Sequence, residues 1–526
     1  MRATLNIGPA GAGGRSTKPD LGPLARGALA LFFAFAATVV LLGLTHAPKR
    51  VSFVVLALIL FLIAFALCGN RRLFFLWGLV LTVPLSVAKV FLVHAHMGGA
   101  SGIYVDLCDF FLFPLLFYIL RDYMRGFRPS LRYSAVLWWW GPMMLLGVID
   151  IVVVPMRMLP FLEVVRMLKL YLLCFVIINE VVRVRQFMHL FAGIAAGIVL
   201  QATVCIVQFV TKANLGLQFL GEPLASTTKL ATISAYLETH DVWRAGGLFR
   251  DPNLLAGYIA LLLPMCIALL FSRINPVAKI MLGGIVAMGL AADGITLSRS
   301  GWLSFGAAFT ALFGFSMLHQ RMRLRYVLAR VMVIISLLAA FGLSSGYILR
   351  RFFESDPGAL SFRYDMMRIA WRMITDNPIF GLGLNTFVAH LPLYADPPGP
   401  EQVTLKYGPN WPVVHDSYLI TWTEQGTVGF VLLVGLYLCI LWRGFCTARR
   451  VLDDRISALA LGATCGIIGI MVDGIGSFFV AEPAGARVFW LVVGTIMGLD
   501  YWTRANYELR GRQLRAAPAQ PARVPA

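Results

Sequence analysis

Long apolar runs, each close to twenty residues, recur along almost the whole chain. A helix needs about 20 predominantly apolar residues to cross the hydrocarbon core of a bilayer. Of the 526 residues, 59% are hydrophobic and only 13% are charged, a balance that excludes a soluble protein of this length. The runs are continuous rather than alternating, so they predict helices and not the strands of a barrel. The chain is therefore expected to fold as an all-α integral membrane protein.

These runs predict about fourteen membrane spans, or twelve to thirteen if the weakest runs do not cross. The expected spans are residues 27–46, 51–68, 73–93, 104–121, 134–155, 163–181, 187–210, 253–272, 276–296, 300–319, 328–348, 416–444, 456–479 and 485–502. The first three and the sixth are the weakest. No cleavable signal peptide is evident, because the Gly-, Pro- and Arg-rich residues 1–26 lead directly into a full-length span.

The basic residues set the orientation of the spans. The formal net charge is +19, and the Arg and Lys clusters fall mostly in short loops that alternate with charge-poor loops such as 94–103. Because cytoplasmic loops collect Lys and Arg, both termini are expected in the cytoplasm. The same topology explains the basic balance without nucleic acid as a partner. The loop at 46–50, with Lys49 and Arg50, fits this orientation poorly.

Two long polar loops, both expected on the outer face, divide the chain. The expected parts are a cytoplasmic tail (1–26), an N-terminal bundle (27–210), a first outer loop (211–252), central spans (253–348), a second outer loop with an amphipathic helix (349–415), C-terminal spans (416–504) and a disordered cytoplasmic tail (505–526). All eight cysteines lie in or beside apolar spans, so neither a disulfide framework nor a Cys-based metal site is predicted.

Eight ionisable residues fall inside expected spans, where charge is expensive and usually faces a bundle interior or a watered cavity. Glu180 lies toward the inner face. The other seven lie in the outer parts of their spans: Lys89, Asp106, Asp109, Asp150, Asp293, Glu424 and Asp473. As a set they favour a polar cavity open to the outer face. The alternative is that individual residues sit at the membrane interface, beyond misplaced helix ends.

The first outer loop ends in a candidate anion site. Arg244 and Arg250 stand just before a span, in the segment RAGGLFRDPNLLAGY. The run Asp251–Pro252–Asn253 predicts a helix start, with a capping side chain and an early proline. Its exposed N–H groups and the two guanidinium groups would bind an anion, with Asn253 as a further contact. The alternative for both arginines is contact with lipid phosphates.

Further arginines lie at the next outer turn and in the second outer loop. Arg299 stands between two serines at a bend, which suits phosphate recognition.

Residues 361–375 have helical spacing and predict an amphipathic helix at the membrane surface, with Phe362, Met366, Ile369, Ala370 and Met373 as its apolar stripe. Arg363, at its start, is the better ligand candidate. Arg368 is a further binding candidate, although Arg368 and Arg372 also suit lipid contact. Gly381 and Gly383 predict a tight turn.

His415 begins the span that follows the second loop. Its pKa is ordinarily near neutral, which suits a general base at the mouth of the cavity. The alternative is an interfacial histidine at a helix end, and metal ligation is not expected because no Cys or His partner is apparent. Asp416 could position a sugar, and Glu424 lies about 13 Å deeper if the helix is continuous. No nucleotide-binding or zincin motif is present, so an enzyme of this kind would use an activated substrate already in the membrane.

These residues resemble those of a known family. His415–Asp416, then nine residues, Gly426, two more and Gly429 resemble the His-[Asn/Ser/Gln]-x9-Gly-x2-Gly signature of O-antigen ligases, with Asp416 as a departure. Arg244 followed by Gly-Leu-Phe, the Ser298–Arg299 turn, and Arg363 leading into NPIFGLG at 377–383 are similar to the wider O-antigen ligase and polymerase superfamily. The similarity covers about 240–430.

The resemblance implies a metal-independent GT-C-type glycosyltransferase that needs no cofactor, sits in the bacterial inner membrane and works at the periplasmic face. Its donor would be a glycan on undecaprenyl diphosphate. Arg244, Arg299 and Arg363 would bind the diphosphate and stabilise the leaving group. His415 would activate or orient the acceptor hydroxyl, with inversion at the anomeric carbon. Expected partners are the lipid-linked donor, a glycan acceptor and membrane lipids.

Two activities compete within this resemblance. A ligase transfers a finished glycan to lipid A-core in lipopolysaccharide biosynthesis, whereas a polymerase extends O-antigen or exopolysaccharide on lipid-linked repeat units and has a chain-length regulator as an expected partner. The long first outer loop and Asp416 favour a polymerase, and the spacing of the histidine signature favours a ligase, which we place first. A transporter of lipid-linked sugar or a small anion is a more distant alternative, since no internal repeat is evident.

Overall fold

The structure is a computed structural model that describes residues 63, 65–94, 99–222, 227–229, 243–249, 251–318, 357–407 and 411–516. The chain divides into two units, Met1–Gly69 and Asn70–Ala526, and almost all described residues belong to the second. The expected spans at 27–46 and 328–348, and most of the one at 51–68, lie outside the described residues.

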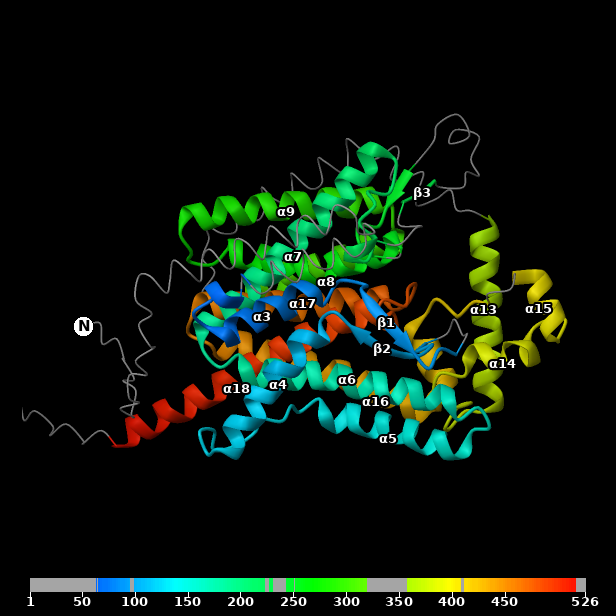
Figure 1. Cartoon of the computed structure of the whole chain (residues 1–526), viewed down its shortest axis with the longest axis horizontal. Helices are drawn as coiled ribbons and strands as arrows, with labels where there is room; N and C mark the ends of the chain where they lie inside the picture. Colours follow the sequence, from blue (N-terminus) through cyan, green and yellow to red (C-terminus); the bar gives the residue numbers. More distant parts are fainter. Residues whose placement is uncertain are drawn as a thin grey trace, which may run out of the picture. The chain divides into compact units, whose positions relative to one another are not determined.

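The second unit is predominantly helical (Figure 1). Its described helices are α3 (Arg71–Thr82), α4 (Asp109–Met124), α5 (Leu137–Val153), α6 (Met158–Glu180), α7 (Val184–Thr211), α8 (Pro252–Leu270), α9 (Pro276–Thr296), α10 (Arg299–Leu318), α13 (Pro357–Asp376), α14 (Phe387–Tyr394), α15 (Pro400–Tyr407), α16 (Ser417–Arg450), α17 (Asp454–Asp473) and α18 (Pro483–Ala516), with a short 3-10 turn at Gln218–Leu220.

Strands in the described residues form two antiparallel ribbons, β1 (Ala88–Phe91) with β2 (Ile103–Asp106) and β3 (Thr227–Lys229) with β4 (Trp243–Ala245). Five described helices, α7, α8, α9, α16 and α17, are long and apolar enough to cross a membrane. The chain is therefore an all-α membrane protein, as its apolar runs predict.

Helix α8 lies at the centre of the packing and is buried along nearly its whole length. It packs against α9, α10 and α17. Two glycines one turn apart on α17 allow the closest approach: a Cβ at Gly466 would lie 2.0 Å from the Leu261 carbonyl oxygen, and one at Gly462 would lie 2.6 Å from the Pro264 carbonyl oxygen. Small residues at this spacing let two membrane helices pack backbone to backbone.

The span predicted at 73–93 is not continuous. Helix α3 ends at Thr82, and the chain then forms the β1–β2 ribbon, in which Lys89 pairs with Val105 and is exposed. Pro84 favours the break, because its missing N–H removes one helix hydrogen bond and its ring clashes with the preceding turn. Lys89 is therefore an exposed residue of an extended strand and not part of a continuous helix.

Arg487 on α18 donates hydrogen bonds to backbone carbonyl groups near the point where α3 ends. Its guanidinium donates to the carbonyl oxygens of Val83 at 3.1 Å and Leu85 at 2.8 Å, and to the Asp106 carboxylate at 2.7 Å. All of these groups are buried, so removing the arginine would leave several buried acceptors without a donor. The end of α3 and the ribbon are thereby attached to α18.

The apolar stripe of α13 faces protein. Its members Met366, Ile369, Ala370 and Met373 are buried in one cluster with residues of α14, α15 and the start of α16. The opposite side of the helix carries exposed Tyr364 and Trp371. The amphipathic helix is present as predicted, but the surface that its stripe covers is a small core of the second long loop, because α14 and α15 fold back over it.

Helix α16 is broken at Gly426, where φ is 62° and ψ is −167°. Glycine is required at this angle. It is also required by space, because a Cβ there would lie 2.2 Å from the Ile379 carbonyl oxygen. The same kink brings Gly429 against Gln425, where a Cβ would lie 2.2 Å from the Gln425 Cβ. Both glycines of the ligase-like signature are therefore explained by the break.

The segment that follows α13 docks into this break. Its N–H groups at Leu382 and Gly383 donate to the carbonyls of Thr423 and Glu424 at 3.0 and 2.9 Å. In return, the N–H groups of Thr427 and Val428 donate to the carbonyls of residues 378 and 379 at 2.8 and 3.2 Å. Gly381 and Gly383 have φ of 75° and 109°, which confirms the predicted tight turn. Four backbone hydrogen bonds thus replace those that the helix loses.

We expect Gly426→Ala to destabilise the protein. The backbone conformation alone disfavours a side chain by about 1–3 kcal/mol, and the contact with residue 379 adds to this. The measurement is the melting temperature of the purified protein in detergent. Gly284→Ala on α9 is the matched control, since no atom lies within 4 Å of its added Cβ. Equal melting temperatures for the two variants would show that the break does not need glycine.

Candidate functional site

The start of α8 forms the first part of the site. Asp251 caps this helix by accepting the N–H of Asn253 at 2.6 Å, and Pro252 takes the first helical position, which confirms the predicted helix start. Arg244 on β4 donates from one terminal nitrogen to the Asn253 side-chain oxygen at 2.8 Å and from Nε to the Thr296 carbonyl at 2.8 Å. Arg244 is therefore held between the start of α8 and the end of α9.

Arg299 is the first residue of α10 and lies next to this group. Ser298 caps α10 by accepting the N–H of Gly301 at 3.2 Å. Gly301 lets α10 begin directly against α8, because a Cβ there would lie 2.2 Å from the Ala256 Cβ. Burial lowers the pKa of Arg244, and the positive charge of Arg299 lowers it further. The two guanidinium groups are thus close enough to repel each other.

Arg363 reaches the same region from α13. Its Nη1 lies 3.8 Å from the position that a Cβ on Gly476 would take, and the Cβ of Ser300 lies 3.7 Å from that same position. Partial desolvation lowers the pKa of Arg363, and the charge of Arg299 is the next cause. Arginine stays protonated at neutral pH despite such shifts. Three positive charges from distant parts of the chain therefore gather here.

His415 lies beside Arg363, just before α16. Its ring packs edge-on between Phe362 and Phe478, with centroids 6.0 and 4.9 Å away. Nδ1 is 3.1 Å from the Val413 carbonyl, which can only accept, so Nδ1 carries the proton and Nε2 has the free lone pair. Burial lowers the pKa of His415 below its ordinary 6.5, and Arg363 lowers it further. The imidazole is therefore neutral at pH 7.

Three helix starts meet around these side chains. The turn at 474–477 accepts from the first residue of α16, through the Ser417 N–H to the Gly474 carbonyl at 2.8 Å and the Ser417 hydroxyl to the Ser477 carbonyl at 3.1 Å. The same turn lies beside Ser300 at the start of α10, which in turn contacts the start of α8. Helix N-termini carry partial positive charge, so the backbone adds to the field of the arginines.

Two acidic residues within reach of the cluster do not belong to the predicted site. The charge of Asp251 raises the pKa values of Arg244, Arg363 and His415, although burial lowers each of these values by more. Asp473, fully buried at the end of α17, also raises the pKa of Arg363. The sequence predicts Asp251 only as a helix cap and Asp473 only as one of several intramembrane acids. It does not predict that they lie near the arginines, because that proximity depends on tertiary packing.

Asp416 serves as the N-cap of α16. Its Oδ1 accepts the N–H groups of Tyr418 and Leu419, each at 2.8 Å, and the side chain is buried. Asn and Ser, two of the three residue types that the signature allows here, are also favoured N-caps. Asp416 therefore has a structural use at the start of α16.

Glu424 holds the segment that docks into the break of α16. Its two carboxylate oxygens accept the N–H groups of Asn385 at 2.8 Å and Phe387 at 3.1 Å. Between residues 417 and 425 the helix is continuous, so Glu424 lies about two turns below His415. The carboxylate is engaged in supporting the loop, and it is separate from the arginine cluster.

One further predicted residue, Arg368, does not join the cluster within the described contacts. Arg368 lies 4.0 Å from the Asp396 carboxylate and is more than half exposed, so it forms a surface ion pair together with Arg372. Arg250 lies outside the described residues.

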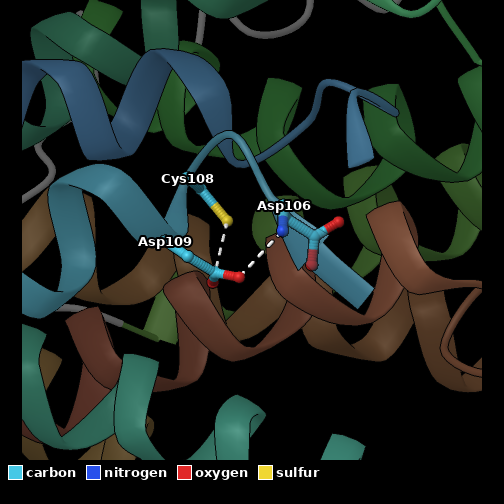
Figure 2. Close-up of side chains that lie close together, drawn as sticks. All are labelled: Asp106, Cys108 and Asp109. Atoms are coloured by element: carbon cyan, nitrogen blue, oxygen red, sulfur yellow. Dashed lines mark hydrogen bonds between the residues drawn. The ribbon is translucent and has the colours of Figure 1, made fainter. Parts of the chain in front are cut away.

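The charges predicted to line an outer cavity are largely used in contacts within the protein. Figure 2 shows Asp106, Cys108 and Asp109 side by side, a combination that could in principle bind a metal ion. Lys169 of α6, however, pairs with both carboxylates, and Arg487 pairs with Asp106. These cations already balance the carboxylates, so the group is an ion-pair network that joins the ribbon and α4 to α6 and α18.

Asp150 and Glu424 are likewise bonded to the docked segment. Asp150 accepts the Leu384 N–H at 2.8 Å. A small polar cavity of about 110 Å³ remains nearby, with Glu163, Arg166, Asn385, Ser417 and Glu424 among its lining residues. The polar interior predicted from the intramembrane charges therefore exists in part, but most of these charges stabilise the fold.

We expect Asp416→Asn to keep the stability of the wild type, because asparagine caps a helix as well as aspartate does. Asp416→Ala removes the acceptor of two partly buried N–H groups and should cost about 1 kcal/mol. Melting temperatures of the purified variants in detergent measure both effects. A loss in the asparagine variant as large as that in the alanine variant would contradict the capping function.

Comparison with known proteins agrees with this geometry. The family model described as O-Antigen ligase matches residues 284–434. This range holds Arg299, Arg363, His415 and the break at Gly426, whereas Arg244 lies before it. No match is found among curated proteins. The match over 284–434 confirms the resemblance of this chain to the O-antigen ligase superfamily.

Proposed function

We propose that the protein is a membrane glycosyltransferase of the O-antigen ligase type. It transfers a glycan from undecaprenyl diphosphate to a hydroxyl group of an acceptor sugar, on lipid A-core or a similar acceptor, at the periplasmic face of the inner membrane. The observation that carries this proposal is the meeting of Arg244, Arg299 and Arg363 with the neutral His415. These residues come from segments as much as 171 positions apart, and a group of like charges with perturbed pKa values is a candidate site for an anionic ligand.

A lipid-linked diphosphate is an anion that suits the cluster. Its oxygens can accept charge-assisted hydrogen bonds from guanidinium groups and from the N–H groups of the helix starts. Arg244 is pre-positioned by its bonds to Asn253 and Thr296, so little conformational freedom is lost on binding. As the glycosidic bond to the phosphate breaks, negative charge grows on the departing diphosphate, and the fixed positive charges stabilise it.

His415 is suited to act on the acceptor. Its Nε2 lone pair would take the proton of the acceptor hydroxyl as the oxygen attacks the anomeric carbon from the side opposite the diphosphate. The new carbon–oxygen bond forms while the bond to the diphosphate oxygen breaks, so the configuration inverts. The flanking rings of Phe362 and Phe478 hold the imidazole, and Arg363 keeps it unprotonated. The proposed reaction uses no metal ion or other cofactor.

A polymerase is the second candidate, because diphosphate recognition and acceptor activation would be the same. Asp416 caps α16, so its departure from the ligase pattern does not by itself favour a polymerase. The family match supports an enzyme of the ligase and polymerase type without separating the two activities, and we place the ligase first on the spacing of the histidine signature. What distinguishes the two is the acceptor, lipid A-core or a second lipid-linked repeat unit.

The direct test is reconstitution in nanodiscs with undecaprenyl-diphosphate-linked glycan and either acceptor, without nucleotide or added metal. Wild type should release undecaprenyl diphosphate and transfer the glycan. Arg244→Ala, Arg363→Ala and His415→Ala should each lose at least about 100-fold in rate, the lower range for removing a charge-stabilising or acid–base group. Lys406→Ala is the control, because its surface pair with Asp365 lies in the same loop and contributes little.

The products decide between the alternatives. A single transfer onto lipid A-core supports a ligase, and a ladder of lengthening lipid-linked chains supports a polymerase. If neither acceptor is used and lipid-linked glycan instead moves across liposomes, the protein is a transporter. Unchanged rates in the three folded variants would remove these residues from the reaction.

The rate should also depend on pH through His415. Protonation below its lowered pKa removes the base, so the rate should fall on the acid side at a pH below 6.5. Asp251→Asn keeps a good helix cap but removes a negative charge that favours the imidazolium ion. The acid limb of kcat/KM should therefore move to lower pH in this variant. A limb that stays in place, or moves upward, would contradict this assignment of the base.

A further inference from the structure

A second cavity lies at the end of α16 opposite to the candidate site. It has a volume of about 760 Å³, and its lining residues include Tyr133, Trp138, Arg443, Asp500 and Arg504. It lies between the loop that precedes α5, the last third of α16 and the middle of α18. None of these residues takes part in the arginine and histidine cluster described above.

The distance along α16 places this cavity at the other membrane interface. Ser417 begins the helix beside His415, and Arg443 lies 26 residues further along it. At about 1.5 Å per residue, the part of α16 before the break at Gly426 accounts for about 12 Å and the part from Thr427 to Arg443 for about 24 Å. A bilayer with its headgroup regions is about 40–45 Å thick. The cavity is therefore level with the headgroups of the leaflet opposite to the proposed transfer site.

The lining has the chemistry of a site for a lipid phosphate. Arg443 and Arg504 share a single carboxylate, that of Asp500, at 3.6 and 3.0 Å. The guanidinium of Arg132 stacks 4.9 Å from the ring centre of Tyr501, which lines the cavity, and its Nη1 is buried without a hydrogen-bond partner among the described residues. Positive charges thus outnumber negative ones by two, and an anion would compensate them.

The aromatic residues indicate that the anion belongs to a lipid. Trp138 is 83% exposed and Tyr133 is 60% exposed, although both line the cavity. Amphipathic rings of this kind gather at the level of lipid headgroups. Basic pockets between membrane helices commonly hold the headgroups of anionic lipids. A soluble anion would bind the positive charges, but its binding would not explain the exposed aromatic side chains of Trp138 and Tyr133.

We propose that this cavity binds the phosphate of one anionic phospholipid of the leaflet opposite to the transfer site. Arg443 and Arg504 contact the phosphate, Arg132 adds charge from behind Tyr501, and Trp138 lies against the glycerol and the upper acyl chains. The bound lipid joins α16 to α18 at this end. The proposal does not depend on the identity of the glycan or the acceptor, since it concerns different residues at the other end of the same helices.

Lipid binding to the full-length protein in detergent tests this, by native mass spectrometry together with the melting temperature. Phosphatidylglycerol should be retained and should raise the melting temperature, whereas phosphatidylcholine should do neither. One basic residue near an anionic lipid contributes about fivefold in affinity. The double variant Arg443→Gln/Arg504→Gln should therefore bind phosphatidylglycerol about 25-fold more weakly.

Two further variants keep the test decisive if the double variant folds poorly. Asp500→Asn removes the carboxylate that competes for both arginines, so it should bind phosphatidylglycerol about fivefold more tightly. A purely structural ion pair would give no such gain. Arg449→Gln, an exposed arginine at the same end of α16 that does not line the cavity, should bind as the wild type does.

Three results would overturn the proposal. Equal retention of phosphatidylcholine would show that the charges do not select the lipid. Equal stabilisation by inorganic phosphate at the same concentration would mark a site for a soluble anion. An Arg449→Gln variant as weak as the double variant would reduce the effect to general surface charge.

Discussion

The docking of the 377–383 segment into the break of α16 is the interaction on which the candidate site depends. A membrane helix that breaks leaves backbone groups without partners, and in a bilayer each such group is costly. Here the carbonyls of Thr423 and Glu424 receive N–H groups from the docked segment, which in turn offers its own carbonyls to residues 427 and 428. The exchange sets the position of α13 relative to the start of α16, and hence that of Arg363 relative to His415.

Buried charged side chains are arranged in two different ways in this protein. At the β1–β2 ribbon, acids and bases are paired in the network of Asp106, Asp109, Lys169 and Arg487 that attaches the ribbon to the helices. At the candidate site, three arginines are grouped, and the charge of Arg299 lowers the pKa values of Arg244 and Arg363 although Asp251 lies nearby. Paired charges support the fold, whereas grouped like charges weaken it and point to a ligand that compensates them.

Much of the site could be predicted because its local signals are strong. Asp251 and Pro252 define a helix start, Gly381 and Gly383 define a turn, and the residues around His415 carry a recognisable spacing. The predictions that were wrong rested on local sequence patterns that are compatible with more than one structure. An apolar run predicts a span at 73–93, yet Pro84 ends the helix, and the stripe of α13 predicts a membrane-facing surface that α14 and α15 instead cover.

The sequence by itself determined that this is a helical membrane protein and which residue types were available for anion binding, because apolar length, helix caps and glycine turns are local properties. Only the tertiary structure decided which charges meet. Asp416 and Glu424 look like ligands in the sequence but bind backbone N–H groups, while Asp251 looks like a cap and also acts on His415. Electrostatic neighbours come from segments far apart in the chain, and only the packing of the helices brings them together.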